Sequence, residues 1–110
     1  MREFGVSWRE EEGVEVLEIH GAIDSRTAGI FGAVIESMAR TGECDLRVDC
    51  HDISFMSSSS VGQLVMLVNE RRAHGRRVAL ERLPDHLLEL IRRMRLETFL
   101  GEPSKERRRK

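Results

Sequence analysis

The chain has few of the residues that build membrane spans, disulfide frameworks and base-stacking surfaces. Its 110 residues include no tyrosine, one tryptophan, two prolines and two cysteines. The longest uninterrupted apolar run, Leu64 to Val68, is far shorter than the roughly 20 residues that a membrane helix requires. The first residues, Met1 to Gly5, carry no apolar stretch of the kind found in a signal peptide. We therefore expect a cytoplasmic protein that does not insert into a membrane.

The two cysteines, Cys44 and Cys50, predict neither a disulfide nor a metal site. Six residues apart along one strand, they would be separated by roughly 20 Å, whereas a disulfide needs Cα atoms within about 7 Å. Metal sites usually show paired ligands at close spacing, and the histidines left to complete one with the segment Cys50-His51-Asp52 are only His20, His74 and His86. We predict a core cysteine, no metal and no cofactor. A thiol enzyme built on that segment stays as an alternative.

The charge of the chain is unevenly distributed, although its net value is only -1. Residues 1–55 hold 5 basic and 12 acidic side chains, whereas residues 56–110 hold 13 basic and 7 acidic ones. The basic residues gather at 71–77 and 105–110, and such clusters can bind phosphate backbones. Because the chain also lacks aromatic platforms and zinc-finger spacing, we expect a solvated helix end, a disordered tail over 101–110 and no nucleic-acid partner.

The apolar residues first follow the period of strands. Phe4, Val6 and Trp8 alternate with polar residues. A turn over 10–13 containing a glycine leads to a second strand over 14–19, and this arrangement is typical of an antiparallel hairpin.

Three helical stripes follow the hairpin. Asp24 or Ser25 caps the first helix, the serines at 57–60 begin the second, and Pro84-Asp85 opens the third. The inward residues that the spacing predicts are Ala28, Phe31, Ile35 and Met38, then Val61, Leu64, Val65 and Val68, and finally Leu87, Leu90, Ile91 and Met94.

The predicted order of elements is therefore β-β-α-β-α-β-α. Strands over 46–50 and 78–80 separate the helices, and 96–100 forms a last packing segment or a short edge strand. Strand-helix-strand units require parallel pairing, while the hairpin adds an antiparallel edge. We predict a single α/β domain over residues 1–100, in which helices pack on a mixed sheet of four to five strands.

The turn Ser57-Ser58-Ser59-Ser60 has the most distinctive chemistry in the chain. It follows the third strand, beyond a hydrophobic plug of Ile53 and Phe55, and lies directly before a helix, where free N–H groups and the helix dipole favour an anion. One interpretation is capping, since Ser57 or Ser58 as N-cap would stabilise the helix by about 1 kcal/mol. The other is a phosphoacceptor, since phosphorylation would add about -1.5 to -2 charges there.

No catalytic motif accompanies these serines. A G-x-S-x-G elbow is absent, because Ser60-Val61-Gly62 lacks the first glycine, and no Walker-type G-K-[S/T] occurs. We therefore expect a protein that is not an enzyme.

Two segments resemble the signature of STAS domains, specifically of the bacterial anti-sigma-factor antagonists. Val48 to Leu64, which contains the turn Ser57-Ser58-Ser59-Ser60-Val61-Gly62, is similar to the strand and the D-S-S-G-L-G-like turn of that family. Leu17 to Asp24 is similar to the family's strand ending in G-x-x-D. The resemblance covers residues 4–100 in matching element order.

The resemblance implies a binding module that switches partners. The unphosphorylated form would bind an anti-sigma factor, a GHKL-type serine kinase, which would end the complex by phosphorylating one serine with ATP. A serine phosphatase would reset the switch. Matching residue by residue makes Ser58 the acceptor, with Ser57, Ser59 and Ser60 as alternatives. The implied partner-binding residues are Asp24, Ser25, Ser57, Ser59, Ser60, Val61, Gln63 and Leu64.

The chain departs from the family pattern at two positions. Ser57 stands where the family has Asp, and Ser60 stands where it has Gly, so one charge and one position of tight backbone approach are lost. These changes are also compatible with an alternative function. In that alternative the chain is a STAS scaffold without phosphorylation, a subunit of a lipid-transport ATPase or of a signalling assembly.

Overall fold

The structure is a computed structural model that describes residues 3–41 and 43–96. Its elements follow the predicted order β-β-α-β-α-β-α. The strands are β1 (Gly5–Glu11), β2 (Val14–Ile23), β3 (Asp45–Met56) and β4 (Val78–Glu81). The helices are α1 (Ala28–Thr41), α2 (Ser58–Ala73) and α3 (Asp85–Arg93). The predicted tail over 101–110 and most of the segment over 96–100 lie outside the described residues.

The four strands form one mixed sheet in the order β1-β2-β3-β4. β1 pairs with β2 in antiparallel fashion, and both β2–β3 and β3–β4 are parallel, as the strand-helix-strand pattern predicts. The hairpin turns tightly at Glu12 and Gly13, whose φ angles of 53° and 81° match the left-handed turn that suits two twisted strands. The predicted α/β fold is confirmed.

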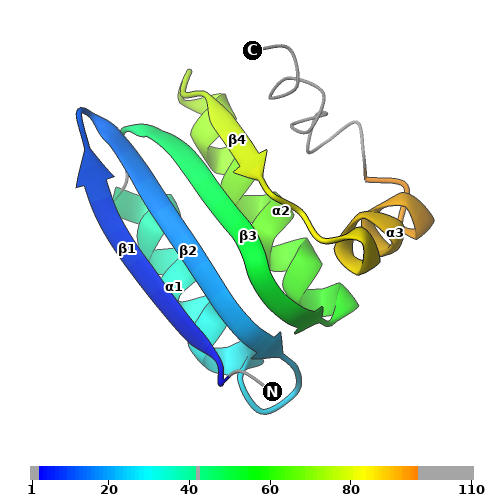
Figure 1. The fold of residues 1–110 in the computed structure, drawn as a ribbon. Coiled ribbons are helices and arrows are strands. Elements are labelled where there is room, and N and C mark those ends of the chain that lie inside the picture. The colour runs from blue at the N-terminus through cyan, green and yellow to red at the C-terminus, as the bar shows by residue number, and fades with distance from the viewer. Residues whose placement is uncertain (1–2, 42, 97–110) are drawn as a thin grey trace.

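Two helices cover one face of this sheet. α1 and α2 lie side by side behind the strands, and α3 lies beyond the end of β4 (Figure 1). The stripes that the spacing predicts point into the core, with Phe31 and Ile35 on α1 and Val61, Leu64 and Val68 on α2 at most 1% exposed. In the described part of the chain no helix covers the opposite face of the sheet (Figure 1), and none is long and apolar enough to cross a membrane.

The central strands are longer than the sequence pattern indicates. β3 runs on to Met56, so Ile53 and Phe55 belong to the strand and do not form a plug beyond it. Register shifts interrupt the β2–β3 pairing between Glu18 and His20 and between Gly21 and Ala22. An irregular ladder breaks the alternation of buried and exposed side chains, which is the reason that the pattern hid the second half of both strands.

The basic segment at the end of α2 is only partly a solvated helix end. Arg71 is 1% exposed, and its guanidinium is buried between α2 and β2, where it contacts Glu15. The expectation of a fully solvated basic cluster is therefore wrong at Arg71, although Arg72, Arg76 and Arg77 are exposed.

Candidate functional site

The four serines lie at the carboxyl edge of the parallel strands, next to the loop that follows β2. β2 and β3 end side by side, with Ile23 paired to Met56, and the N–H of Ser57 donates to the carbonyl oxygen of Ile23 at 3.0 Å. Because Asp24 follows Ile23 directly, the sheet brings Asp24 and the serine turn to one edge. Sites in open α/β sheets usually collect at this edge.

Ser57 is the N-cap of α2. It has extended backbone angles, φ -73° and ψ 160°, and its Oγ accepts a hydrogen bond from the N–H of Ser60 at 3.3 Å. The same hydroxyl donates to Ser60 Oγ at 2.9 Å. The capping interpretation is thus confirmed at Ser57.

The four hydroxyl groups differ in their exposure. Ser60 is 0% exposed, and its hydroxyl is held by Ser57. Ser58 and Ser59 are exposed, and Ser59 Oγ lies 3.3 Å from Ser57 Oγ. Within residues 3–41 and 43–96, Ser58 Oγ makes no hydrogen bond. Of the four serines, Ser58 is therefore the one whose hydroxyl is both exposed and uncommitted.

The loop after β2 is fixed by its own polar side chains. Asp24 Oδ1 accepts from the N–H of Arg26 at 2.9 Å, and this hydrogen bond is the main cause that lowers the pKa of Asp24. Thr27 Oγ1 accepts from the N–H of Asp24 at 3.0 Å and donates to the carbonyl oxygen of Ala22 at 2.9 Å. The expected cap is confirmed at Asp24, because its side chain accepts from Arg26 and its carbonyl oxygen accepts from the N–H of Ala28 at 2.8 Å, although the turn over 25–27 precedes the start of α1 at Ala28.

Three of the predicted partner-binding residues are not available to a partner. Val61 and Leu64 are each 1% exposed within the core, and Ser60 is fully buried. Gln63 is half-buried on the side of α2 that faces α1, where a Cβ added at Gly32 would lie 2.5 Å from Gln63 Nε2. The amphipathic spacing that places Val61 and Leu64 in the core already argued against their use as contacts.

Two residues that the sequence reasoning did not select belong to this edge. Phe55, two residues before the serine turn, is 51% exposed. Arg26 has a largely exposed side chain, with Nη2 3.5 Å from Asp24 Oδ2. An exposed aromatic next to a small polar turn is a feature that contact surfaces favour. Its signal in the sequence was masked, because an aromatic in an apolar strand is ordinarily predicted to be buried.

The segment Cys50-His51-Asp52 offers no support for thiol chemistry. Cys50 is 0% exposed, and burial raises the pKa of its thiol to about 12, which opposes formation of the thiolate nucleophile. The prediction of a core cysteine is confirmed for Cys50, whereas Cys44 is only half-buried. Both thiols are free. Among the described residues, no group of three or more His, Cys, Asp or Glu side chains is placed to hold a metal ion.

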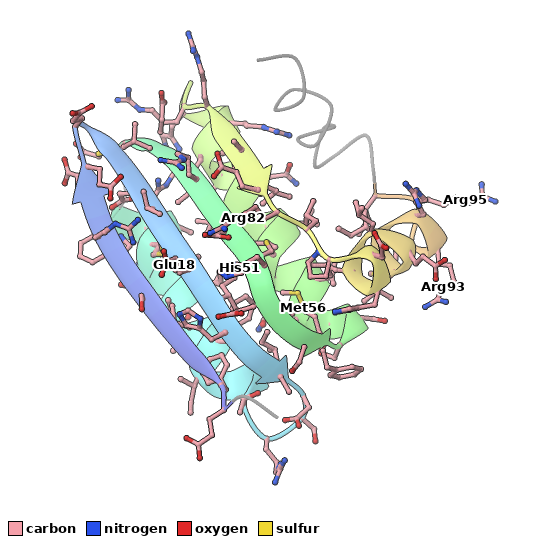
Figure 2. All side chains as sticks on the ribbon, in the orientation of Figure 1. Glu18, His51, Met56, Arg82, Arg93 and Arg95 are labelled. Carbon is pink, nitrogen blue, oxygen red and sulfur yellow. The ribbon has the colours of Figure 1, made fainter. Side chains whose placement is uncertain are left out.

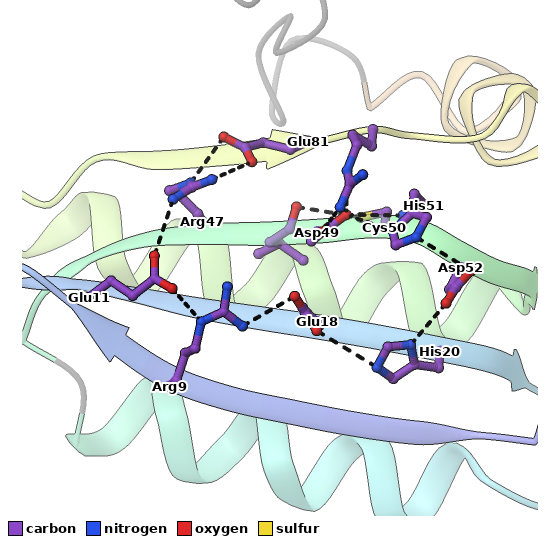
Figure 3. A network of polar contacts seen from close by, with 12 residues as sticks. Arg9, Glu11, Glu18, His20, Arg47, Asp49, Cys50, His51, Asp52 and Glu81 are labelled. Atoms are coloured by element: carbon purple, nitrogen blue, oxygen red, sulfur yellow. Dashed lines mark hydrogen bonds and ion pairs between the residues drawn. The ribbon is translucent and has the colours of Figure 1, made fainter.

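The uncovered face of the sheet carries a network of ion pairs. In Figure 2, Glu18, His51 and Arg82 lie on the side of the strands away from α1 and α2. The ion pairs drawn in Figure 3 join Arg9 to Glu11 and Glu18, and Arg47 to Glu11 and Glu81. His20 Nδ1 lies 3.3 Å from Asp52 Oδ2. Three arginines, Arg9, Arg47 and Arg82, face five carboxylates in this network, so the face carries an excess of negative charge.

A family model described as "Mlab, STAS domain" matches residues 6–102 of the chain. The chain belongs to the STAS domain family. Its four-stranded mixed sheet with three helices is thus the fold of a STAS domain. No curated protein gives a significant match.

Solved structures support the fold. The anti-sigma factor antagonist SpoIIAA in its unphosphorylated form is 18% identical over 97% of this chain and 95% of its own, with a TM-score of 0.71. The phosphorylated form of SpoIIAA from Bacillus matches with a TM-score of 0.67 at 18% identity, covering 97% of this chain and 98% of that one. An anti-sigma factor antagonist from Mycobacterium paratuberculosis is 17% identical over 90% of this chain and 84% of its own, with a TM-score of 0.76.

Proposed function

We propose that this STAS domain is a cytoplasmic anti-sigma-factor antagonist that switches partners through phosphorylation of Ser58. The observation that carries the proposal is the different state of the four serines. Ser57 is committed to capping, Ser60 is buried, and Ser58 presents a free hydroxyl at the start of α2. The solved anti-sigma factor antagonists that share its fold support the class of function, since one of them is described in a phosphorylated form.

The start of α2 is suited to a phosphoryl group. The N–H groups of Ser58 and Ser59 donate to no other atom of the described residues, and the positive end of the helix dipole lies at the same point. A kinase would transfer the γ-phosphoryl group of ATP to Ser58 Oγ, so that an O–P bond forms, the bond to the β-phosphate oxygen breaks, and the hydroxyl proton passes to a base of the kinase. The product carries about -1.5 to -2 charges.

The added charge would act on a surface that we name the switch edge. We define it as the half-buried Asp24 and the exposed Ser25, Phe55, Ser58 and Ser59, which lie on the loop after β2, at the end of β3 and in the first turn of α2. A phosphoryl group at Ser58 would repel Asp24 and any acidic group of the partner, while Arg26 would attract it. The change needs no refolding, because Ser57 and Ser60 hold the first turn of the helix.

The partner class that fits this switch is an anti-sigma factor that is itself a GHKL-type serine kinase, with a serine phosphatase to reset the acceptor. Phe55 would supply apolar contact area, and the serine hydroxyls would enter the kinase active site. A surface of this kind loses affinity when one buried contact point becomes a dianion.

Affinity capture of the tagged chain, followed by incubation of the captured complex with ATP and phosphosite mapping by mass spectrometry, tests the proposal. We expect a GHKL-type ATP-binding partner and a single phosphate on Ser58. A Ser59→Ala variant serves as the matched control and should accept phosphate as the wild type does, whereas Ser58→Ala should not. Stoichiometric capture of a transport ATPase or a large signalling assembly, with no phosphate on any of the four serines, would overturn the proposal in favour of a scaffold.

A further inference from the structure

A group of arginines lines a pocket at the end of the sheet opposite to the switch edge. The pocket has a volume of about 580 Å³ and is lined at the amino ends of β3 and β4 and the carboxyl end of α2. We call it the arginine pocket and define it by Arg47, Arg72, Arg76 and Arg77. Its one acidic lining residue is Asp45.

The backbones of Arg76 and Arg77 make hydrogen bonds to neighbouring segments, whereas their side chains make none within the described residues. The N–H of Arg76 donates to the carbonyl oxygen of Arg71 at 2.9 Å, and the N–H of Arg77 donates to Asp45 Oδ1 at 2.9 Å. The carbonyl oxygen of Arg77 accepts from the N–H of Leu46 at 2.9 Å. Within the described residues, neither the Arg76 nor the Arg77 guanidinium takes part in a hydrogen bond or ion pair. The backbone at both residues is thus fixed, and the two charged side chains extend from it into solvent.

The dipole of α2 does not explain why positive charges are placed at Arg76 and Arg77. Cations in the last turn of a helix are stabilised by its dipole, and this explains Arg71 and Arg72. Arg76 and Arg77 come after Gly75, beyond the end of α2. Arg47, in contrast, is already matched, because its guanidinium donates to both carboxylate oxygens of Glu81 at 3.1 and 3.0 Å. The unmatched positive charge of the pocket therefore lies on Arg76 and Arg77, whereas Arg72 Nη2 donates to the carbonyl oxygen of Val78 at 3.4 Å.

The composition of the pocket restricts the kind of anion that it could hold. No aromatic side chain lines it, so a nucleobase would find no stacking surface. The exposed large apolar residues of the described chain lie elsewhere, at Trp8, Ile30, Phe55 and Met66, so nothing beside the pocket would enter a lipid bilayer. The planar fork of arginine is complementary to carboxylates, so a row of acidic side chains suits this pocket.

The position of β4 adds a backbone surface to that charge. β4 is the last strand of the sheet, and its pairing with β3 leaves its other edge without a strand in the described part of the chain. An extended peptide can add to such an edge through main-chain hydrogen bonds. Val78 and Ala79, which belong to β4, also line the arginine pocket. A peptide on this edge would therefore pass directly beside the guanidinium groups.

We propose that the arginine pocket and the edge of β4 bind an acidic, extended segment of a partner protein. The segment would lie along β4, and its Glu or Asp side chains would pair with Arg76 and Arg77. Because β3 begins at this pocket and ends at the switch edge, the two sites lie at opposite ends of the sheet (Figure 1). The second site can be occupied whatever the state of Ser58.

The experiment titrates the full chain into a fluorescein-labelled ten-residue peptide in which Glu alternates with Thr, with fluorescence anisotropy as the readout. We expect the double variant Arg76→Gln/Arg77→Gln to bind roughly fivefold to tenfold more weakly, as expected for two lost ion pairs. The matched control is Arg92→Gln/Arg93→Gln, which removes the same charge from the exposed end of α3 and should leave affinity unchanged. Amide chemical shifts of Val78–Glu81 should move in the wild type as the peptide is added.

Three outcomes would overturn the proposal. Equal weakening by both double variants would show a nonspecific charge effect. Tighter binding of a labelled single-stranded oligonucleotide, or of vesicles containing phosphatidylglycerol, through Arg76 and Arg77 would assign the pocket to phosphate and not to an acidic peptide. Unchanged amide chemical shifts of Val78–Glu81 would show that the peptide does not add to the edge of β4. Circular dichroism melting of each variant separates these results from unfolding, and a Ser58→Ala chain should give the wild-type peptide affinity.

Discussion

Arg71 of α2 and Glu15 of β2 form a buried ion pair that joins the helix layer to the sheet. Arg71 is 1% and Glu15 is 8% exposed. The same guanidinium donates to the carbonyl oxygen of Cys44 at 2.9 Å and to that of Met38 at 3.1 Å. One side chain therefore connects α2, the end of α1, the loop before β3 and β2. Charges are buried in proteins at a cost that only such multiple hydrogen bonding offsets.

Replacing Arg71 by Ala should destabilise the domain strongly. Removal of one partner leaves the Glu15 carboxylate buried without its cation and takes one donor from each of two carbonyl oxygens, and a broken buried pair costs about 3–5 kcal/mol. Urea denaturation would measure this loss in the free energy of unfolding. The matched control is Arg72→Ala at the exposed neighbouring position, for which we expect a loss below about 1 kcal/mol. Equal losses for the two variants would show that Arg71 contributes only as a surface residue.

The sequence predicted most of the fold because its apolar spacing was regular where the packing is regular. The stripe of Val61, Leu64 and Val68 is buried as its spacing requires. Glu15 and Arg71 were not recognised, because a charged pair is buried only through contacts 56 positions apart in the chain, which local patterns do not contain.

The sequence predicted where the candidate site lies more accurately than it predicted the role of each residue in it. A turn of small polar residues before a helix locates the edge, so the serines and Asp24 were found together. Which hydroxyl caps, which is buried and which is free depends on the backbone angles at the turn, which the residue types alone do not determine. The register shift between Gly21 and Ala22 breaks the alternation of buried and exposed positions just before Phe55, so its exposure could not be predicted either.

Loss of the cap at Ser57 should lower stability, whereas loss of the neighbouring hydroxyl should not. In Ser57→Ala the N–H of Ser60 and the buried Ser60 hydroxyl lose their partner, and we expect a loss of about 1–2 kcal/mol. Ser58→Ala, one position along, should change the free energy of unfolding by less than about 0.5 kcal/mol. Chemical denaturation of both variants checks this. A larger effect at position 58 than at 57 would mean that the cap is assigned to the wrong serine.

Charge at position 58 should act on partner binding and not on the fold. With the captured partner, Ser58→Ala should keep the affinity of the unphosphorylated chain, and Ser58→Asp should weaken it by at least about tenfold, or 1.4 kcal/mol. Ser7→Asp adds the same charge at an exposed position on β1 and should leave affinity unchanged. Isothermal titration calorimetry measures all three. Equal affinities for the Ala and Asp variants at position 58 would contradict the proposal that charge at Ser58 controls partner binding.

Gly21 should tolerate no side chain. Its φ is 84°, and a Cβ there would lie 2.5 Å from the carbonyl oxygen of Glu3, a backbone atom that cannot rotate away. Gly21→Ala should therefore lower the free energy of unfolding by about 2 kcal/mol or more. Gly29→Ala in the first turn of α1, where nothing lies within 4 Å of an added Cβ, should cause no loss. Thermal melting of both variants would test whether this point of close backbone approach is required.

The buried thiol of Cys50 should make the domain less stable at high pH. A thiol in an unfolded chain has a pKa of about 8.5, whereas burial raises the pKa of Cys50 to about 12. The unfolded state therefore releases a proton that the folded state retains, so the contribution of Cys50 to stability is complete below about pH 8.5 and falls as the pH rises from there toward 12. Urea denaturation at pH 7.5 and 10 would show this fall in the wild type. It should shrink in a Cys50→Ala variant and persist in Cys44→Ala, because the buried thiol carries the larger change; an identical fall in all three chains would place its origin in other groups.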